Sequence, residues 1–433
     1  MMSREPSSRA AEMEERLVDL TRELIRAETY NPPGNEARAA EVLSEFFESV
    51  GIEHLVLGRE PGRSNLVAWV GDGGPSVLLA GHLDTVPPGG GWTVDPLGAE
   101  LRDGRIYGRG ATDMKGGVAA AAVALAVLAE ADVQGRVILA ATADEEMGSE
   151  YGMAWLARER PDLIRADFAL ICEPSGSETL GKFVVIGEKG SVVVRIRARG
   201  KLAHSSVPEL GENAIEKMAI LLSRIRETRV RRVKPPISKV DLIRQFASKY
   251  GWGSVLRSLL SRGEGSKKAS AALRAMTSVT ISPGIVRGGV KVNVVPDLCE
   301  AHVDFRILPG HTPQDVVGAL KDLVRRIGLE GVEIEVQEFV EPSVLTGLDW
   351  PVDLLDSLVR KFYGEKPLRI VMPGASDARF LRNWLGVPAV QFGPGVAEAA
   401  HAADEYVEVE DLVRSTQVYV EFAKEFLARC SRS

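Results

Sequence analysis

Four times between residues 76 and 173, a segment with the character of a β-strand ends at a histidine or an acidic side chain. Two of these segments, 76–80 and 136–142, are largely apolar runs, which are typical of strands buried on both faces of a parallel sheet. The carboxyl ends of parallel strands meet at one edge of the sheet, where ligands bind in α/β folds. The polar residues at the four strand ends are His82 with Asp84, Asp113, Glu145 with Glu146, and Glu173. We therefore expect an α/β fold with a functional site at this edge.

The first strand end carries a histidine and an aspartate two residues apart, His82 and Asp84. Side chains alternate along a strand with a period of two, so both should point the same way. This arrangement suits an imidazole that binds a metal while a carboxylate orients its other ring nitrogen. The His-x-Asp pattern is weak alone, and the metal hypothesis depends on the partners downstream.

Three consecutive carboxylates, Asp144 to Glu146, follow the run 136–142 and repel one another. One interpretation is a solvated helix N-terminus, where acidic side chains are favoured. The other is that a cation binds here while one carboxylate stays free to move protons. Because several strand ends deliver histidines and carboxylates to one edge, the sequence favours a metal centre.

The pattern changes after residue 187, which indicates a second domain. Residues 191–197 alternate apolar and basic side chains, as expected of a half-solvated strand. Further strands are predicted at 278–283, 291–295 and 300–307, and helices at 213–228 and 312–327. We expect a small α+β sandwich at 188–340, inserted into a main domain made of residues 1–187 and 341–433.

An insert at 229–276 interrupts the predicted sandwich. The surrounding segment 224–274 carries 14 Lys or Arg residues against three Asp or Glu. Basic amphipathic segments can bind nucleic acid or membranes. The insert lacks a clean stacking pattern of aromatic residues, so we interpret it as a solvated helical decoration.

The composition is that of a soluble cytoplasmic protein. A net charge of -7 argues against a nucleic-acid partner over the whole surface. The three cysteines are scattered and suit a reducing compartment rather than a disulfide framework. Residues 1–15 contain no apolar signal segment, and the longest apolar run, 118–129, is too short to span a bilayer. We expect no membrane or nucleic-acid partner.

Together with a late histidine, His401, these motifs resemble the M20 family of metallohydrolases. That family includes succinyl-diaminopimelate desuccinylase, acetylornithine deacetylase, aminoacylase and glutamate carboxypeptidase. The matching motifs occur in the family's order and cover nearly the whole chain: Gly81-His82-Leu83-Asp84, Gly108-Arg109-Gly110, Asp113-Met114-Lys115-Gly116-Gly117, Asp144-Glu145-Glu146, Cys172-Glu173-Pro174 and His401. The resemblance implies a zinc-exopeptidase-like α/β catalytic domain with an inserted lid or dimerisation domain.

The resemblance also implies a site with two divalent metal ions, zinc before cobalt or manganese. One metal would be bound by His82, Asp113 and Glu173, and the other by His401, Asp113 and Glu146, with Asp113 bridging. Glu145 would be the general base, Asp84 would orient His82, and the peptide bond after Asp113 would be cis. Two cations that share a carboxylate bring the pKa of a bridging water towards ~7, and Glu145 could take its proton.

The inserted domain has candidate residues of its own by the same resemblance. His204 would stabilise the oxyanion, often from the partner subunit of a homodimer formed through this domain. Asn293 and Arg306 would hold a substrate carboxylate, which an arginine fork suits well. Gly374, Ser376 and Asp377 would line the substrate pocket. The basic insert leaves the mode of dimerisation open.

The predicted activity is metal-dependent hydrolysis of an amide bond in a small N-acyl amino acid, of the succinyl-diaminopimelate desuccinylase or acetylornithine deacetylase type. A metallopeptidase that cleaves short peptides and an aminoacylase remain as alternatives, because acyl-group choice depends on pocket shape and a few loop contacts. A non-catalytic binding protein on the same fold would be expected to have lost Glu145 or a ligand, and none is missing.

Overall fold

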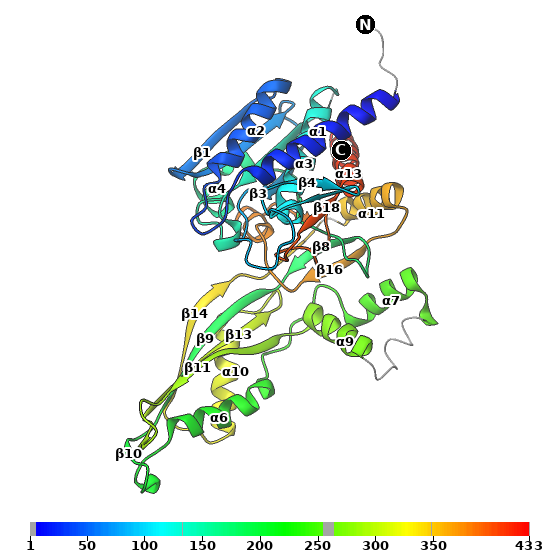
Figure 1. Cartoon of the computed structure of the whole chain (residues 1–433). Helices are drawn as coiled ribbons and strands as arrows, with labels where there is room; N and C mark the ends of the chain where they lie inside the picture. Colours follow the sequence, from blue (N-terminus) through cyan, green and yellow to red (C-terminus); the bar gives the residue numbers. More distant parts are fainter. Residues whose placement is uncertain (1–5, 132, 254–263, 348, 433) are drawn as a thin grey trace. The chain divides into compact units, whose positions relative to one another are not determined.

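The computed structural model describes residues 6–131, 133–253, 264–347 and 349–432. The chain forms two compact units (Figure 1). Unit 1 comprises Met1–Ile186, Leu345–Arg369 and Ser376–Ser433, and unit 2 comprises Gly187–Val344 and Ile370–Ala375. The predicted insertion borders are residues 188 and 340, and the return of 370–375 to unit 2 has no counterpart among the predictions.

A mixed sheet forms the centre of unit 1. Its strands run in the order β1-β2-β6-β3-β7-β17-β8. These are β1 (His54–Glu60), β2 (Arg63–Val70), β6 (Arg136–Thr142), β3 (Ser76–His82), β7 (Phe168–Ile171), β17 (Ala389–Gln391) and β8 (Phe183–Glu188). The four strands β6, β3, β7 and β17 run parallel to one another. Strand β2 is antiparallel to its neighbour β6, and β1 is antiparallel to β2. β8 also pairs with β15 (Ser343–Val344) and β16 (Leu368–Met372), where the chain passes between the units.

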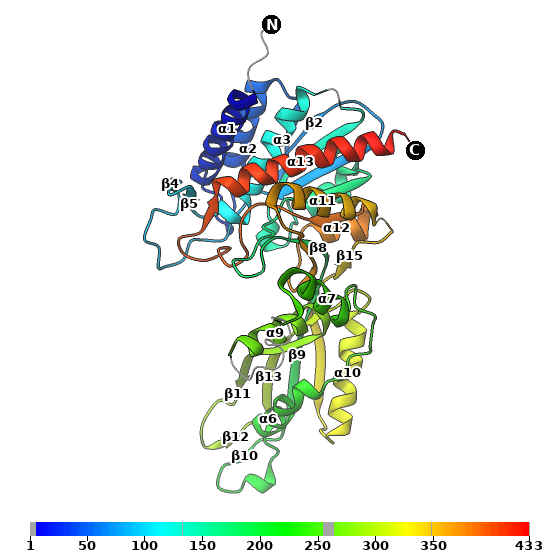
Figure 2. The same cartoon turned by 90° about the vertical axis from the view of Figure 1, so that its right-hand side faces the viewer.

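Helices cover both faces of this sheet (Figures 1 and 2). Strand β3 shows why, because Val77 and Leu79 belong to one buried cluster while Leu78 and Ala80 belong to another. The first face is covered by α1 (Pro6–Arg26), α2 (Ala37–Val50), α3 (Gly116–Ala129), α11 (Trp350–Tyr363) and α13 (Val409–Cys430). The second is covered by α4 (Met153–Glu159), α5 (Pro161–Ile164) and α12 (Ala378–Phe380). The predicted α/β fold is confirmed.

Helix α3 is the centre of the first buried cluster. The stretch Ala111–Ala129 is long and apolar enough to cross a membrane, but 89% of it is buried inside the protein. Its close approach to β7 requires glycine, since a Cβ at Gly117 would lie 2.1 Å from the carbonyl oxygen of Cys172. The helix therefore serves as packing for the sheet, and its N-terminus meets the end of the neighbouring strand.

Unit 2 is a four-stranded antiparallel sheet with helices on one face. The strand order is β11 (Thr280–Gly288), β13 (Leu298–Ile307), β9 (Gly190–Arg199) and β14 (Val332–Val340). α6 (Ala214–Arg224) and α10 (Pro313–Arg326) bury their apolar sides against it. The predicted strand 291–295 is reduced to β12 (Val294–Val295), which pairs with β10 (Ala203–His204) in a separate short ribbon.

The basic insert contains two helices, α7 (Lys239–Tyr250) and α9 (Glu264–Thr277). Leu242 and Ala247 are the buried residues of α7. Residues 254–263 of the predicted insert lie outside the described part of the chain. The described part is a helical decoration of unit 2, as the composition suggests.

Candidate metal centre

Five side chains of unit 1 form two groups that share one carboxylate. His82, Asp113 and Glu173 form one group, and Asp113, Glu146 and His401 form the other, with the ligand atoms of each group within 4.8 Å of one another. The Nε2 atom of His82 is 3.2 Å from Oδ1 of Asp113, and the Nε2 atom of His401 is 3.2 Å from Oδ2 of the same side chain. Asp113 thus offers one oxygen to each group.

The donor set fits two divalent cations of the zinc type. Imidazole nitrogen and carboxylate oxygen are normal zinc ligands, and bonds of about 2.0–2.2 Å in a tetrahedron place ligand atoms roughly 3.3 Å apart. His82 Nε2 is 3.6 Å from Glu173 Oε1, and His401 Nε2 is 3.1 Å from Glu146 Oε1. These separations match the spacing that a shared cation requires.

The charges of this cluster shift the proton affinities of its members. Burial opposes a charge on His82, but its hydrogen bonds with Asp113 and Asp84 raise the pKa of the imidazole well above its usual value. Hydrogen bonds to Asp113 and Glu146 raise the pKa of His401 to about 10. Burial, with the neighbouring Asp113 charge, raises the pKa of Glu173 well above the ordinary glutamate value. Without cations the histidines therefore hold protons between the carboxylates.

Asp84, two residues beyond His82, faces the imidazole with both its backbone and its side chain. The Nδ1 atom of His82 lies 2.8 Å from the backbone carbonyl oxygen of Asp84. The same atom lies 3.5 Å from the carboxylate of Asp84. The Asp84 carboxylate also accepts hydrogen bonds from the backbone N–H groups of Glu145 and Glu146, at 3.0 and 3.1 Å. The orienting role of Asp84 stays a prediction, and the same side chain also holds the next loop.

That loop, residues 144–149, is called the base loop here because it carries Glu145. Partial removal from water raises the pKa of the Glu145 carboxyl well above its usual value, against the opposing charge of His82. A raised pKa makes a carboxylate a better proton acceptor near neutral pH. Glu145 belongs to neither ligand group. A carboxylate beside the two groups but outside both is suited to general base catalysis.

Several residues of the centre escaped the sequence analysis, and Glu405 is the foremost. Its buried carboxylate accepts hydrogen bonds from the backbone N–H groups of Thr112 and Asp113, both at 2.9 Å, and pairs with the buried Arg109. Arg109 also donates to the backbone oxygen of His401 at 3.3 Å. The only available signals were the arginine in Gly-Arg-Gly and a glutamate four residues after His401. The expected cis peptide bond follows Asp113.

A second overlooked set holds the start of the base loop. The Asp144 carboxylate accepts hydrogen bonds from Asn31 at 2.9 Å and from Arg63 at 2.7 Å. Asn31 also donates to the Asp84 carboxylate at 2.9 Å. Arg63 forms a further ion pair with the buried Glu36, so both charged partners are satisfied inside the protein.

The predicted residues of the inserted domain lie in unit 2. His204 is exposed in β10, and the backbone oxygen of Asn293 accepts a hydrogen bond from the N–H of Ser205, so these two positions are neighbours. Arg306 lies in β13 and pairs with Asp304 at 2.8 Å. Gly374 also belongs to unit 2. Their roles towards a substrate remain predictions.

Ser376 lies in unit 1 and is used internally. Its hydroxyl is buried and accepts hydrogen bonds from Gln391 Nε2 at 2.7 Å and from the backbone N–H of Ala378 at 3.2 Å. These contacts brace the turn before α12. The predicted substrate contact of this side chain gains no support from them.

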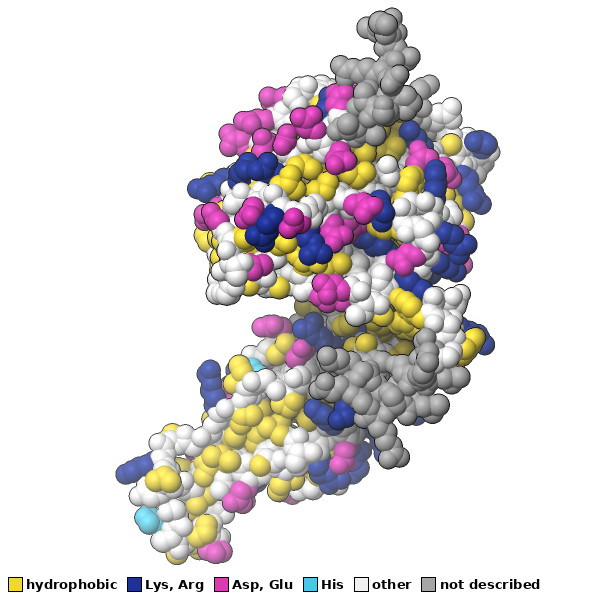
Figure 3. All heavy atoms as spheres, turned by 45° about the vertical axis from the view of Figure 1, so that its right-hand side comes forward, with side chains coloured by type: hydrophobic (Ala, Val, Ile, Leu, Met, Phe, Trp, Pro, Cys, Tyr) yellow, Lys and Arg dark blue, Asp and Glu magenta, His cyan; other side chains and the backbone are white. Residues whose placement is uncertain are grey.

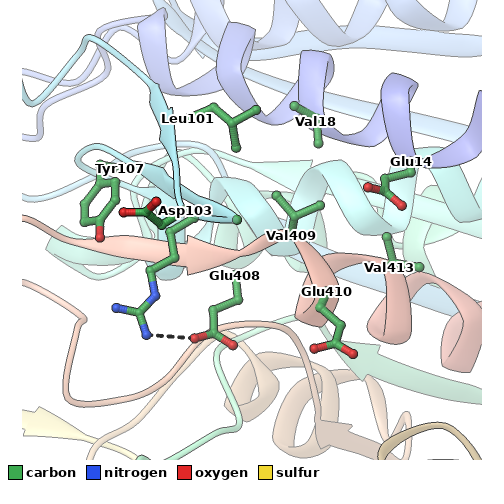
Figure 4. A pocket seen from close by; sticks show the side chains of 11 residues that line it. Glu14, Val18, Leu101, Asp103, Tyr107, Glu408, Val409, Glu410 and Val413 are labelled. Atoms are coloured by element: carbon green, nitrogen blue, oxygen red, sulfur yellow. Dashed lines mark hydrogen bonds and ion pairs between the residues drawn. The ribbon is translucent and has the colours of Figure 1, made fainter. Parts of the chain in front are cut away.

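A pocket of about 710 Å³ lies on unit 1 between α1, α13 and the hairpin of β4 (Glu100–Arg102) and β5 (Arg105–Tyr107) (Figure 4). Val18, Leu101 and Val413 contribute apolar walls, and Arg105 pairs with Glu408 at 2.9 Å. None of the predicted site residues lines it. The pocket is therefore separate from the ligand cluster.

Two ligand groups that share a carboxylate at the edge of an α/β sheet, with a free glutamate beside them, define a metal-dependent amidohydrolase or peptidase. The chain belongs to peptidase family M20/M25/M40, whose model matches residues 78–425. The family predicted from the motifs is confirmed.

Individual proteins agree with this assignment. The succinyl-diaminopimelate desuccinylase of Rhodospirillum centenum is 30% identical over 419 residues, which cover 93% of this chain and 95% of that protein. The enzyme of the same name from Gluconacetobacter diazotrophicus is 30% identical over 420 residues, covering 95% and 97%.

Solved structures show the same fold. An M20 family metallo-carboxypeptidase from Sulfolobus solfataricus has a TM-score of 0.75 at 24% identity and covers 96% of this chain and 99% of its own. A dinuclear metal binding peptidase of the M20 family from Bacillus subtilis has a TM-score of 0.61 at 14% identity, covering 96% and 99%. The identities are low, so these neighbours establish the architecture alone.

Proposed function

We propose that this enzyme removes the acyl group from a small N-acyl amino acid, with N-succinyl-diaminopimelate as the first candidate substrate. The observation that carries the proposal is the sharing of Asp113 by two ligand groups while Glu145 stays outside both. The choice of the succinyl substrate rests on relatives of that name, which are 30% identical over nearly the whole chain.

The residues of the centre divide the reaction between them. When bound, divalent cations at the two groups supply a lowered water pKa and a polarised scissile carbonyl. Glu145 accepts the proton of the attacking water and returns it to the leaving amine. Asp84 keeps Glu145 in place through the backbone of the base loop. His204 donates a hydrogen bond to the oxyanion.

We infer that two zinc ions are the natural cofactors. The two groups together contain two imidazoles and three carboxylates, a mixture that suits zinc and leaves cobalt or manganese as substitutes. Metal analysis of the purified protein tests this inference directly.

The proposal includes a homodimer, because one protomer cannot present both His204 and Arg306 to one small substrate. Both residues belong to unit 2, where Arg306 pairs with Ser191 near one end of β9 and β13. At the other end Leu298 pairs with Arg199, just before the β10 ribbon that carries His204 (Figure 1). The stretch from Leu298 to Arg306 spans roughly 27 Å at about 3.4 Å per residue, more than the length of an N-acyl amino acid. A partner's unit 2 would have to provide one of the two.

The edges of the unit 2 sheet favour β11 as the dimer contact. On the β14 edge, Glu333 and Glu335 form ion pairs with arginines of β9, which discourages pairing with another strand. On the β11 edge, Ile285 and Val286 are exposed, and the neighbouring α6 exposes Ile220. Figure 3 shows apolar side chains gathered on one face of this unit. Such a patch next to an open strand edge is suited to a second copy of the chain.

We further infer the division of the chain into domains. Residues 1–187 and 341–433 form the catalytic domain, and residues 188–340 form the inserted domain. The enzyme acts in the cytoplasm on a small-molecule or short-peptide substrate, without a membrane or nucleic-acid partner.

A combined metal and activity assay tests the proposed function. Metal-free protein is reloaded with zinc or cobalt and offered N-succinyl-diaminopimelate, N-acetylornithine, other N-acetyl amino acids and dipeptides. Metal-dependent release of succinate supports the proposal. Turnover of dipeptides or N-acetyl amino acids instead would move the assignment to a peptidase or an aminoacylase. Failure to bind metal under any loading condition would refute the whole assignment.

A further inference from the structure

The base loop has an unusual backbone that something must hold in place. Asp144 and Ser149 both adopt left-handed conformations, with φ of 68° and 67°, and Gly148 has a φ of 109°. Left-handed conformations are costly for residues other than glycine and persist only where the surroundings impose them. The position of Glu145 therefore depends on contacts at both ends of this loop.

At its start and middle, the loop is held by residues already described. Asp144 is fixed by Asn31 and Arg63, and the N–H groups of Glu145 and Glu146 are fixed by Asp84. At its end, Ser149 is fully buried, and its hydroxyl donates a hydrogen bond to the buried carboxylate of Asp377. The backbone N–H of Ser149 also donates to the carbonyl oxygen of Asp144 at 2.6 Å.

Asp377 contacts the chain on both sides of the base loop. One carboxylate oxygen accepts from Ser149, and the other lies 3.2 Å from the hydroxyl of Thr142, the last residue of β6. A single buried side chain thus bridges the end of β6, two positions before the loop, and the residue that ends the loop. Arg379, two positions further along, lies with Nη2 3.5 Å from the carbonyl oxygen of Gly148.

We propose that Asp377 is a positioning residue for catalysis, which clamps the base loop between Thr142 and Ser149 and so fixes the general base Glu145. The assignment rests on the proposed function for the identity of the base, but the clamp itself is independent of the substrate. The proximity of the Asp377 charge is also one of the factors that raise the pKa of Glu145, after its removal from water. Asp377 belongs to neither ligand group, so the clamp does not require it to bind a metal.

The hydroxyl of Thr142 allows a sharp choice of variant. It lies 3.2 Å from both the carbonyl oxygen of Gly81 and the Asp377 carboxylate, and its one proton can serve only one of them. An asparagine at position 377 could accept from Ser149 with its oxygen and donate to Thr142 with its amide. Asp377→Asn should therefore preserve the clamp, whereas Asp377→Ala should open it.

The experiment compares zinc-loaded wild type, Asp377→Ala and Asp377→Asn by hydrogen exchange and by kinetics. In Asp377→Ala we expect faster amide exchange in residues 144–149, two bound zinc ions, an unchanged KM, and kcat lowered about 10–100-fold, as for other residues that support catalytic groups. Asp377→Asn should restore the exchange pattern and most of kcat. Ser149→Ala removes the same bond from the loop side and should reproduce the exchange result if Asp377→Ala folds poorly.

Asp356 provides a matched control. It is a buried aspartate of α11 that pairs with Arg369, and Asp356→Ala should leave exchange in the base loop unchanged. Unchanged loop exchange in both Asp377→Ala and Ser149→Ala would overturn the clamp, as would equal acceleration in the Asp356→Ala control. If wild type cleaves none of the substrates, the proposed function fails, and the exchange data still decide the clamp.

Discussion

The backbone N–H of Asp113 donates a hydrogen bond of 2.9 Å to the carboxylate of Glu405, which lies 292 residues further along the chain. Because the same carboxylate pairs with Arg109, and Arg109 donates to the backbone oxygen of His401, one buried acid connects the shared ligand to a ligand of the second group. The geometry of both groups therefore depends on a residue that belongs to neither.

Replacement of Glu405 by glutamine should weaken metal binding. The carboxylate accepts bonds from three backbone N–H groups as well as from Arg109, and an amide would turn N–H donors towards some of them. We expect zinc affinity to fall about 10–100-fold and the free energy of unfolding to fall by roughly 3–5 kcal/mol, as when a buried ion pair loses one member. Zinc titration and urea unfolding measure the two effects.

The control for that variant is Glu410→Gln. Glu410 is an exposed residue near the start of α13 whose partner is the neighbouring Arg414, so its loss should change neither quantity measurably. Wild-type zinc affinity in Glu405→Gln would show that the ligands hold their positions without this support.

Glu145→Ala should separate metal binding from catalysis. The side chain belongs to neither ligand group, so both metals should remain bound. Loss of the general base should lower kcat by about 10²–10⁴-fold, the usual contribution of such a group. Glu150→Ala, an exposed glutamate just after the base loop, serves as the control. Turnover near the wild-type rate in a fully loaded Glu145→Ala protein would remove Glu145 as the base.

His204→Ala should lower turnover without loss of metal, because the exposed imidazole lies outside both ligand groups. Removal of one oxyanion donor costs about 10²–10³-fold in kcat. His302→Ala, on β13 of the same unit and paired with Glu300, should have no such effect. Equal losses in the two variants would point to a structural defect of unit 2.

Mixed dimers test whether His204 acts across the interface. In a dimer of His204→Ala with Glu145→Ala, one of the two sites would contain an intact Glu145 and receive an intact His204 from the other chain. Up to half of the wild-type turnover should return. Verified mixed dimers with no recovered activity would confine His204 to its own protomer.

His82, Glu146 and Glu173 could be predicted from the sequence because each follows an apolar strand of the central sheet, whereas Asp113 follows β5 of a separate three-stranded sheet and His401 was assigned only by the resemblance. His82 follows the apolar strand β3 directly, and the parallel order of β3, β6 and β7 brings the strand ends together. The hydrophobic periodicity and the strand direction were enough to predict that these side chains lie at one edge of the sheet. The division of these ligands between two metal ions could be predicted only from the resemblance to the family.

The supporting residues could not be found in this way, because their contacts are distant in the sequence. Glu405 reaches Asp113 across 292 positions, and Ser149 reaches Asp377 across 228. Nothing in the local sequence of Glu405 distinguishes it from a solvated carboxylate, and the Gly/Ser loop around Asp377 suggested a pocket residue rather than a partner of Ser149. Ser376 has internal contacts that its position in a Gly/Ser turn did not indicate, because its hydroxyl braces the turn; its substrate contact stays a prediction.

The contribution of Lys115 to the stability of the metal-free protein should rise with pH. This side chain is fully buried, its ammonium group donates to the carbonyl oxygen of Ala27 at 2.7 Å, and burial lowers its pKa to about 7 despite nearby carboxylates. In the unfolded chain the pKa returns to 10.5. Between these values Lys115 binds more protons in the unfolded state than in the native state, so its contribution to the free energy of unfolding increases as the pH rises from about 7 to 10.5.

Lys115→Met isolates this contribution. The difference in free energy of unfolding between wild type and Lys115→Met should shift in favour of wild type by about 1 kcal/mol per pH unit across that window, and should be constant below pH 7. Urea unfolding of metal-free protein at several pH values measures it, with Lys424→Met on the surface of α13 as the control for loss of a lysine. A difference that stays flat from pH 7 to 10 would mean that Lys115 keeps its proton in the folded protein. The neighbouring acids Glu405, Asp84 and Glu36 would then be sufficient to hold a buried charge beside the metal centre.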